Sequence, residues 1–487
     1  MDKLRPIMFV GTGSDVGKSV VNAGFCRVFL QDGYSPAPFK AQNMSLNSYA
    51  TPDGLEIGRA QAAQAEACGL ACSVEMNPIL LKPSGNLTSQ VIVNGKPCGN
   101  ATAKSYFRGN FRQDLFERVL TAYHKLEQKH NPIVIEGAGS ISELNLKDKD
   151  IVNMRVAVAT RAATYLVTDI DRGGVFASVY GSIMLLPPEE RACIKGVIIN
   201  KFRGDISLFD EGKKIIKELT GIPVVGVLPY APEIYIEQED SVVLERLQTK
   251  SKEGKINIGV VRHKLFSNFT DFDMLSQIPE INLYFSEDPM EIAKADIIII
   301  PGSKNTIADL ERMHENGMAE VILKHHKAGK SLYGICGGYQ MMGRSVQDPH
   351  HIEGDQEYTN GLGILPVDTI ISTEKSTKSC TFSFMNESIH GTGYEIHMGV
   401  TKTDKPLLRT SHNEEDGYIL NSRTWGTYLH GILDNASVIN RIIQEIDPNF
   451  HTDIDYKAKK EKGFNALADL IRTHVDMDYI YQTMKQE

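Results

Sequence analysis

A glycine-rich segment near the start of the chain has the residues needed to bind phosphate groups. Residues 11–19 read GTGSDVGKS and lie between a short apolar run, Ile7–Val10, and a helix-like stretch, Val20–Leu30. Glycines let backbone N–H groups turn inward around phosphate oxygens, and the N-terminus of the next helix adds the positive end of its dipole. The segment therefore predicts a phosphate-binding loop between a strand and a helix.

Two side chains at the end of this loop could act on a bound nucleotide. Lys18 would reach the terminal phosphates, and the Ser19 hydroxyl would ligate Mg²⁺. The spacing departs from the standard pattern, because Thr12 stands where that pattern has glycine. A plain strand-to-helix turn is the alternative, but such a turn does not require the sequence Gly-Lys-Ser. We therefore predict ATP binding by Gly13, Val16, Gly17, Lys18 and Ser19.

Other polar residues follow predicted strands and could serve the same site. Glu136 ends the run Ile133–Ile135, where a carboxylate faces the crevice at the carboxyl ends of parallel strands. It would hold Mg²⁺, or else be a solvated loop acid. Lys40 follows a second candidate strand and would neutralise a transferring phosphoryl group, unless it is an ordinary surface lysine. The DIDRGG segment at 169–174 is either a substrate or metal contact or a structural turn.

A second group of residues could perform nucleophilic chemistry. Cys336 stands between a strand-like run, Ser331–Gly334, and two glycines, Gly337 and Gly338. A sharp turn there would expose the sulfur, and the N-terminus of the following helix would favour the thiolate. The backbone N–H of Gly337 could stabilise an oxyanion. The alternative is a buried structural cysteine.

A nucleophilic cysteine needs a base, and several histidines follow Cys336 in the sequence. They are His350, His351, His390, His397, His412 and His430. His430 ends a strand-like run and precedes Gly431, a position that suits a base on a strand-end loop. The residues alone favour His430 without excluding the other histidines.

These groups must be positioned by parallel sheets. Short, nearly continuous apolar runs alternate with helix-length segments, as is typical of parallel strands buried on both faces. One series runs from Ile7 to Val227, and a second begins at Ile256. The polar stretch 245–255 between them is a candidate linker or a charged surface helix. We expect an α/β protein with catalytic domains at 1–245 and 251–440 and a helical tail at 441–487.

The composition excludes several other classes of protein. Of the 487 residues, 41% are hydrophobic and 23% are charged, close to the average for globular domains, which excludes disordered, collagen-like and coiled-coil chains. The net charge of -9 disfavours a nucleic-acid partner. No apolar run predicts a membrane span, and the N-terminus lacks the pattern of a signal peptide. Seven scattered cysteines without a CxxC pair indicate a reducing, cytoplasmic location, with the thiols other than Cys336 packed in the core.

The N-terminal motifs together resemble dethiobiotin synthetase and its relatives. These P-loop enzymes activate a carboxylate as an acyl phosphate, and the threonine at position 12 agrees with their pattern. The resemblance implies that Lys40 and Glu136 serve ATP and Mg²⁺ chemistry. It also implies that Asn200, which follows the strand-like run Gly196–Ile199, contacts the adenine.

Four longer segments resemble the cobyric acid synthases, the amidase-ligases of corrin ring assembly. They are residues 40–45 (KAQNMS), 56–61 (EIGRAQ), 77–83 (NPILLKP) and 169–176 (DIDRGGVF). The resemblance implies an ATP-driven amidoligase domain at 1–245. Its substrate would be adenosyl-cobyrinic acid a,c-diamide, amidated with glutamine nitrogen at carboxylates b, d, e and g. Related ligases also allow a homodimer.

The C-terminal motifs resemble the class I, or triad, glutamine amidotransferases, which have a flavodoxin-like α/β fold. In these enzymes a cysteine attacks the glutamine side-chain amide and a histidine moves the proton, so the resemblance selects His430 as the partner of Cys336. Pro301-Gly302-Ser303 matches the loop that supplies an oxyanion N–H, which assigns Gly302 to the oxyanion site beside Gly337.

One position departs from the usual amidotransferase pattern. The family places a glutamate two residues after the histidine, and this chain has Ile432 there. The corrin amidases share this absence. Glu395 is a candidate substitute for the missing third member of the catalytic set.

Three other interpretations are open at this stage. Cobyrinic acid a,c-diamide synthase, which amidates the a and c carboxylates, would share both sites. A partitioning-type (MinD/ParA-like) switch ATPase would share the P-loop and act as a non-enzymatic protein bound to DNA or membrane, but it would not need Cys336 or His430. A free-standing thiol hydrolase would not need residues 1–240.

Overall fold

The computed structural model describes residues 2–84, 88–102, 111–237, 248–384 and 387–485. Its N-terminal half is built on a six-stranded parallel sheet with the order β12-β11-β10-β1-β9-β2. The strands are β1 (Ile7–Gly11), β2 (Ala37–Phe39), β9 (Ile133–Glu136), β10 (Ala163–Asp169), β11 (Ile194–Phe202) and β12 (Val224–Pro229). Their apolar residues are buried on both faces, as the uninterrupted apolar runs predicted.

Helices cover the two faces of this sheet and form two separate hydrophobic cores. Because side chains alternate along a strand, Met8 and Val10 enter one core while Ile7 and Phe9 enter the other. The first core is covered by α4 (Phe111–Glu127), α5 (Met154–Thr160), α6 (Val175–Met184) and α8 (Asp210–Thr220). The second is covered by α1 (Lys18–Gln31), α14 (Tyr456–His474) and α15 (Met477–Met484).

The predicted C-terminal tail is helical and returns to the N-terminal half. Helix α14 packs along α1, where Gly24 leaves room for it. A Cβ atom at position 24 would lie 2.2 Å from Ile471 Cδ1, so a larger residue there would force the side chains of α14 to shift. Phe464 and Leu467 of α14 are buried in the same core. The last helices therefore complete the hydrophobic core of the first sheet.

The C-terminal half has a second six-stranded sheet with the order β14-β13-β15-β16-β24-β23. Its strands are β13 (Ile256–Val261), β14 (Ile281–Ser286), β15 (Ile297–Ile300), β16 (Ser331–Ile335), β24 (Thr424–Thr427) and β23 (Tyr418–Asn421). All pair in parallel except the edge strand β23. Two parallel sheets on one chain confirm the predicted two-domain α/β architecture.

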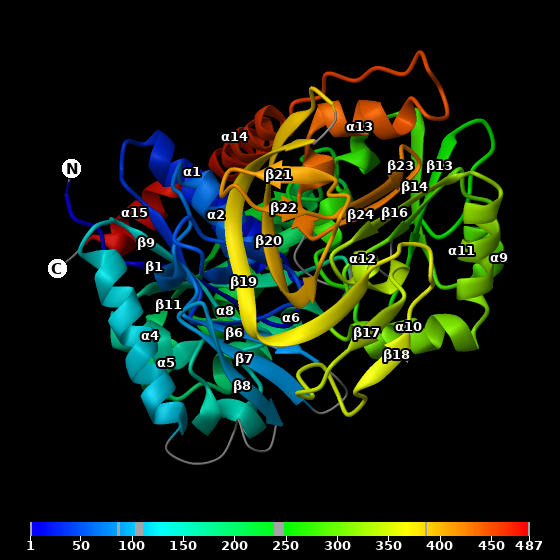
Figure 1. The fold of residues 1–487 in the computed structure, drawn as a ribbon. Helices are drawn as coiled ribbons and strands as arrows, with labels where there is room; N and C mark the ends of the chain where they lie inside the picture. Colours follow the sequence, from blue (N-terminus) through cyan, green and yellow to red (C-terminus); the bar gives the residue numbers. More distant parts are fainter. Residues whose placement is uncertain (1, 85–87, 103–110, 238–247, 385–386, 486–487) are drawn as a thin grey trace.

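A long antiparallel ribbon, which the sequence analysis did not anticipate, connects the two halves. It consists of β19 (Asp368–Phe384) and β20 (His390–Thr401), the curved yellow arrows of Figure 1. Strand β20 lies against β4 (Ser48–Ala50) of the N-terminal half. In β19, Lys375 forms an ion pair with Glu56, which also binds Lys82 at 2.8 Å. The two catalytic halves thus share a buried, charged interface.

Other sequence predictions had mixed outcomes. Residues 245–247 of the predicted linker lie outside the described residues, and the limits 1–245, 251–440 and 441–487 stay a proposal. Of the six cysteines predicted to pack in the core, Cys98 is exposed and Cys193 is half-buried, so that prediction is wrong for these two. Among the helices of the described residues, none is long and apolar enough to cross a membrane.

The docking of α14 generates a prediction about stability. Replacing buried Ile471 by alanine leaves a cavity between α14 and α1, and we expect the free energy of unfolding to fall by about 2–5 kcal/mol. Asp469→Ala, at an exposed position of the same helix, should change it by less than about 0.5 kcal/mol. Urea denaturation followed by circular dichroism measures both; equal stability of the two variants would contradict a structural role for the tail.

Candidate active site

The phosphate-binding loop lies between β1 and α1, at the centre of the first sheet. Gly17 precedes α1 with φ +94°, in the left-handed region that favours glycine. The ammonium group of Lys18 donates hydrogen bonds to the carbonyl oxygens of Gly13 (2.8 Å) and Gly139 (3.0 Å). These bonds hold the lysine along the loop, in the position from which it could contact phosphate oxygens.

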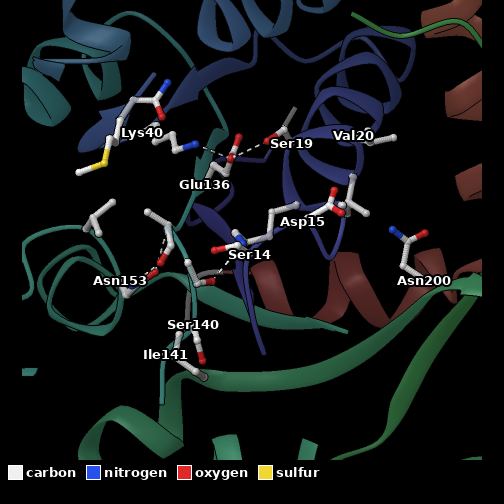
Figure 2. A pocket seen from close by; sticks show the side chains of 18 of the residues that line it. Ser14, Asp15, Ser19, Val20, Lys40, Glu136, Ser140, Ile141, Asn153 and Asn200 are labelled. Carbon is white, nitrogen blue, oxygen red and sulfur yellow. Dashed lines mark hydrogen bonds and ion pairs between the residues drawn. The ribbon is translucent and has the colours of Figure 1, made fainter. Parts of the chain in front are cut away.

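Glu136 is the centre of a buried polar cluster beside this loop. Its Oε1 accepts hydrogen bonds from Ser19 Oγ and Lys40 Nζ, each at 2.8 Å, as Figure 2 shows. Its Oε2 accepts a hydrogen bond of 2.6 Å from Gln64. Glu136 is only 1% exposed and Lys40 only 5% exposed. The alternatives of a solvated acid and a surface lysine are therefore wrong.

The charge state of Glu136 follows from these neighbours. Burial alone would raise the pKa of this carboxyl, but Lys40 and the hydrogen bonds from Lys40, Gln64 and Ser19 outweigh it and hold the pKa below its usual value. Glu136 is thus an ionised carboxylate beside the Ser19 hydroxyl. Hard oxygen donors of this kind, together with substrate phosphates, fit Mg²⁺. Among the described residues no cluster of three or more His, Cys, Asp or Glu forms an all-protein metal site.

The loop and this cluster open into a large cavity of about 720 Å³. Figure 2 shows side chains that line it, among them Ser14, Ser19, Ser140 and Asn153. Helix α14 adds Leu467 and Leu470, and β3 (Gln42–Met44) adds its polar side chains. The cavity is large enough for a nucleotide and part of a second ligand, and its walls combine apolar and charged groups.

Two further predicted positions border the same loop. The side-chain amide of Asn200 donates to the Val16 carbonyl at 2.9 Å and lines the cavity. In the DIDRGG segment, Asp169 pairs with Lys201 at 3.0 Å, and Arg172 pairs with Asp15 at 2.9 Å. The segment therefore borders the phosphate loop through ion pairs.

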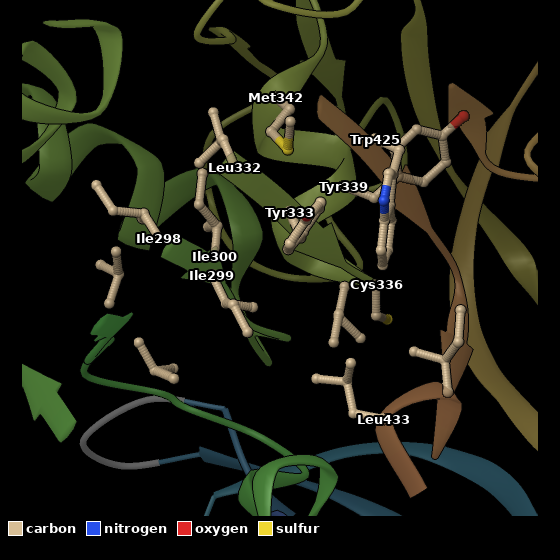
Figure 3. Packing of buried hydrophobic residues seen from close by; sticks show 14 of the residues in the cluster. Ile298, Ile299, Ile300, Leu332, Tyr333, Cys336, Tyr339, Met342, Trp425 and Leu433 are labelled. Atoms are coloured by element: carbon tan, nitrogen blue, oxygen red, sulfur yellow. The ribbon is translucent and has the colours of Figure 1, made fainter. Parts of the chain in front are cut away.

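Cys336 lies at a strained turn between β16 and α12 (Gly337–Met342). Its backbone has φ +52° and ψ -110°, a conformation that is costly for a non-glycine residue and is typical of functional turns. Its N–H donates to the Thr427 carbonyl at 2.7 Å. Figure 3 shows the cysteine at the end of a core that includes Tyr333 and Trp425. The rigid core fixes the direction of the thiol.

The predicted oxyanion loop lies beside this turn. A Cβ atom at Gly337 would be 2.8 Å from the backbone nitrogen of Ser303, and one at Gly338 would overlap the Ile300 carbonyl at 1.9 Å. A Cβ atom at Gly302 would lie 3.5 Å from His430 Cε1. The structure therefore brings together Gly302, Gly337, Cys336 and His430, which are separate in sequence.

His430 is held between an acid and the thiol. It lies on β25 (Leu429–His430), and its Nδ1 is 2.6 Å from Asp271 Oδ2. The other oxygen of Asp271 accepts from the Gly431 N–H at 3.0 Å. Burial alone would lower the pKa of His430, but Asp271 and the hydrogen-bonded Cys336 outweigh it and raise the pKa to about 10. A histidine beside a cysteine, oriented in turn by an acid, is the arrangement expected of a nucleophile and its base.

The third member of this set is Asp271, and Glu395 does not fill that place. Glu395 lies on β20, one residue from the partner of His430, but its side chain contacts His397 Nε2 at 3.5 Å and Ser376 Oγ at 3.3 Å. Alternate side chains of a strand point to opposite faces, so adjacency in register did not bring the carboxylate to His430. In the sequence, Asp271 is the single acid of residues 266–272, which also contain three phenylalanines. An acid that is buried with such residues needs a hydrogen-bond or charge partner.

Comparison with known proteins matches both halves of the chain. A CobQ/CobB/MinD/ParA nucleotide binding domain matches residues 7–242, and a CobB/CobQ-like glutamine amidotransferase domain matches residues 257–438. The cobyric acid synthase of Parabacteroides distasonis is 56% identical over 99% of both chains. That of Bacteroides fragilis is 54% identical over 99% of this chain and 98% of its own.

The chain belongs to the cobyric acid synthase family. This membership makes it a glutamine-hydrolysing ligase of cobalamin biosynthesis. A more distant cobyric acid synthase, from Syntrophobacter fumaroxidans, is 44% identical over 98% of each chain. A solved glutamine amidotransferase matches 39% of this chain and 97% of its own at 15% identity and a TM-score of 0.29, a likeness too weak to bear on the site.

The His430–Asp271 pair generates a prediction about glutamine hydrolysis. Asp271→Asn removes the negative charge that raises the pKa of His430, so that pKa should fall from about 10 toward its ordinary value. The imidazolium would then lose its proton at lower pH, and the glutaminase kcat should fall roughly 10³-fold. Glutamate release and NMR titration of His430 measure the two effects.

The same experiment discriminates between the two acids. Glu395→Gln should leave the glutaminase kcat within about threefold of wild type, because Glu395 contacts His397. A large loss in Glu395→Gln combined with normal activity in Asp271→Asn would reverse the assignment made from the geometry.

Proposed function

We propose that this chain amidates carboxylates b, d, e and g of adenosyl-cobyrinic acid a,c-diamide to give adenosylcobyric acid. The nitrogen would come from glutamine at the Cys336–His430 site, and ATP would activate each carboxylate in the cavity of the N-terminal half. The observation that carries the proposal is the pairing on one chain of a contiguous Cys336–His430–Asp271 set with a phosphate loop that opens into a large cavity.

Glutamine hydrolysis follows from the geometry around Cys336. The thiolate sulfur attacks the side-chain amide carbon, and the N–H groups of Gly302 and Gly337 stabilise the oxyanion. His430 donates its proton to the departing nitrogen, so ammonia leaves and a thioester remains. Water then hydrolyses the thioester to glutamate and restores the thiolate–imidazolium pair.

Activation of the corrinoid carboxylate belongs to the phosphate loop. A carboxylate oxygen attacks the γ-phosphorus of ATP while the bond to the bridging oxygen of ADP breaks, which gives an acyl phosphate. Lys18 and Lys40 would stabilise the charge on the transferring group, and Asn200 would contact the adenine. Ammonia then attacks the acyl carbon, phosphate leaves, and the amide forms.

The Ser19 hydroxyl and the Glu136 carboxylate would hold Mg²⁺ when ATP is bound. The ion would neutralise phosphate charge and orient the γ-phosphoryl group. Lys40 and Gln64 donate hydrogen bonds to the same carboxylate. These two side chains keep Glu136 ionised and oriented toward the loop.

The proposed substrate is supported by the relatives of the chain. The near-full-length relatives are named cobyric acid synthases, which favours the a,c-diamide over the substrate of the a,c-diamide synthases. The amidotransferase half argues against a switch ATPase. A homodimer and a cytoplasmic location are part of the proposal, the latter on the cysteine pattern.

Loss of the thiol tests the coupling of the two reactions. Cys336→Ala should lower the glutamine-driven rate roughly 10³-fold or more and leave amidation with free ammonia close to wild type, because the phosphate loop is intact. ADP release and mass spectrometry of the corrinoid follow the reaction, with cobyrinic acid as the rival substrate. If ammonia fails to support the variant, the two-site mechanism is wrong.

Loss of the buried carboxylate tests the proposed Mg²⁺ position. Glu136→Gln should lower ammonia-driven amidation at least roughly 10-fold and raise the Mg²⁺ concentration needed for half-maximal rate, while the glutaminase rate is retained. Glu117→Gln, on an exposed turn of α4, serves as the control. An unchanged Mg²⁺ requirement would remove Glu136 from the metal site.

A further inference from the structure

A reciprocal pair of buried hydrogen bonds joins the two catalytic halves. The Ser48 N–H donates to Asn268 Oδ1 at 3.1 Å, and the Phe269 N–H donates to Asn47 Oδ1 at 3.0 Å. The four residues are at most 5% exposed. We call this pair of bonds the Asn47–Asn268 clasp. It connects the segment after β3 with the start of the turn that carries Asp271.

The clasp sets the start of the turn that carries Asp271. That turn is η5 (Phe269–Phe272), and Asn268 precedes it with φ +52°, in the left-handed region. Asparagine tolerates this conformation, but it must be held by its surroundings. The clasp binds the side chain of Asn268 and the first N–H of η5. Both contacts lie within three residues of the carboxylate that orients His430.

The N-terminal segment that carries Asn47 and Ser48 also reaches His430, through two aromatic contacts. The Tyr394 ring stacks on the His430 ring with centroids 5.4 Å apart, and Tyr49 packs against Tyr394 at 4.5 Å. The guanidinium of Arg59 lies 4.6 Å above the Tyr49 ring. Tyr49 directly follows the clasp residues Asn47 and Ser48. One short segment of the N-terminal half therefore contacts both the turn that carries Asp271 and the tyrosine that stacks on His430.

The position of this segment is set within the N-terminal half. The backbone N–H of Arg59 donates to the backbone carbonyl of Asn47 at 3.2 Å, and Lys82 Nζ donates to Ser48 Oγ at 2.8 Å. The segment follows β3, whose residues Gln42–Met44 line the cavity of the phosphate loop. The clasp therefore lies between the wall of the ATP cavity and the glutaminase site.

We propose that Asn47 is a positioning residue for glutamine hydrolysis: the N-terminal half, through the Asn47–Asn268 clasp, holds Asp271 and thereby orients His430 toward Cys336. This inference rests on the proposed roles of Cys336 and His430. It assigns to the KAQNMS segment and its continuation a role in the reaction of the other half. Glutamine hydrolysis then depends on a contact made by the domain that consumes the ammonia.

The test is a comparison of the two half-reactions in full-length variants. Asn47→Ala leaves the Phe269 N–H without its acceptor and loosens η5. We expect the glutaminase kcat to fall roughly 10–100-fold, because small misplacements of catalytic groups cost this much, with KM for glutamine changed less than about threefold. Ammonia-driven amidation should stay close to wild type.

Two further variants separate positioning from loss of structure. Asn268→Ala removes the reciprocal acceptor from the other half and should give the same fall in kcat. Gln90→Ala crosses the same interface through a contact with Met398 Sδ at 3.9 Å, outside η5, and should stay within about threefold of wild type. Circular dichroism confirms that each variant is folded.

The outcomes are distinguishable. Normal glutaminase kcat in Asn47→Ala, or a parallel loss of ammonia-driven amidation in that variant, would overturn the positioning role. Wild-type protein without glutaminase activity would instead contradict the proposed function itself.

Discussion

The amidotransferase site depends on one buried charged pair, Asp271 with His430. Both side chains are about 2% exposed and their atoms approach to 2.6 Å. A buried charge is tolerated only when it is paired and hydrogen-bonded, and breaking such a pair is strongly destabilising. The Gly431 N–H occupies the second oxygen of Asp271, so the carboxylate is satisfied on both sides. The direction of His430 follows from this pair.

The nucleotide-binding half also contains a buried carboxylate that is stabilised by its neighbours, but the residues differ. Glu136 is buried at the end of β9, and burial by itself would raise the pKa of its carboxyl. Hydrogen bonds from Lys40, Gln64 and Ser19 outweigh this effect and keep the carboxyl ionised. Each site thus contains a buried carboxylate that its hydrogen-bond partners hold in a fixed direction. The two carboxylates differ in partner: Asp271 pairs with His430, while Glu136 accepts hydrogen bonds from side chains beside the phosphate loop.

Long-range contacts complete both halves. Helix α14 supplies Leu467 and Leu470 to the cavity of the first half, although it follows the second half in the chain. The ribbon of β19 and β20 lies against β4, and Lys375 pairs with buried Glu56 of the N-terminal half. Separating the halves would leave buried charges without partners. Contacts between distant parts of the chain therefore contribute to the wall of the cavity and to the buried ion pairs between the halves.

Much of the fold could be predicted from local patterns. Strands β1, β9, β11, β13 and β16 lie where uninterrupted apolar runs predicted them, because burial on both faces leaves a continuous signal. The ribbon β19–β20 was missed because its residues alternate irregularly around a bulge at 371–376. The return of the tail to α1 was missed because its only trace, a glycine at position 24, has no meaning without knowledge of the facing helix.

The sequence by itself determined the two chemistries, since a phosphate loop and a cysteine between a strand and glycines are local motifs whose turns depend on neighbouring residues. The partners of those groups were decided only by the tertiary structure. Asp271 is 159 residues from His430, and Gln64 is 72 residues from Glu136. Which acid reaches the histidine depends on strand faces and on how the halves pack, as Glu395 and Asp271 illustrate. Spacing along a chain carries no information about such contacts, because burial and pairing are settled only when the sheets and their connections are assembled.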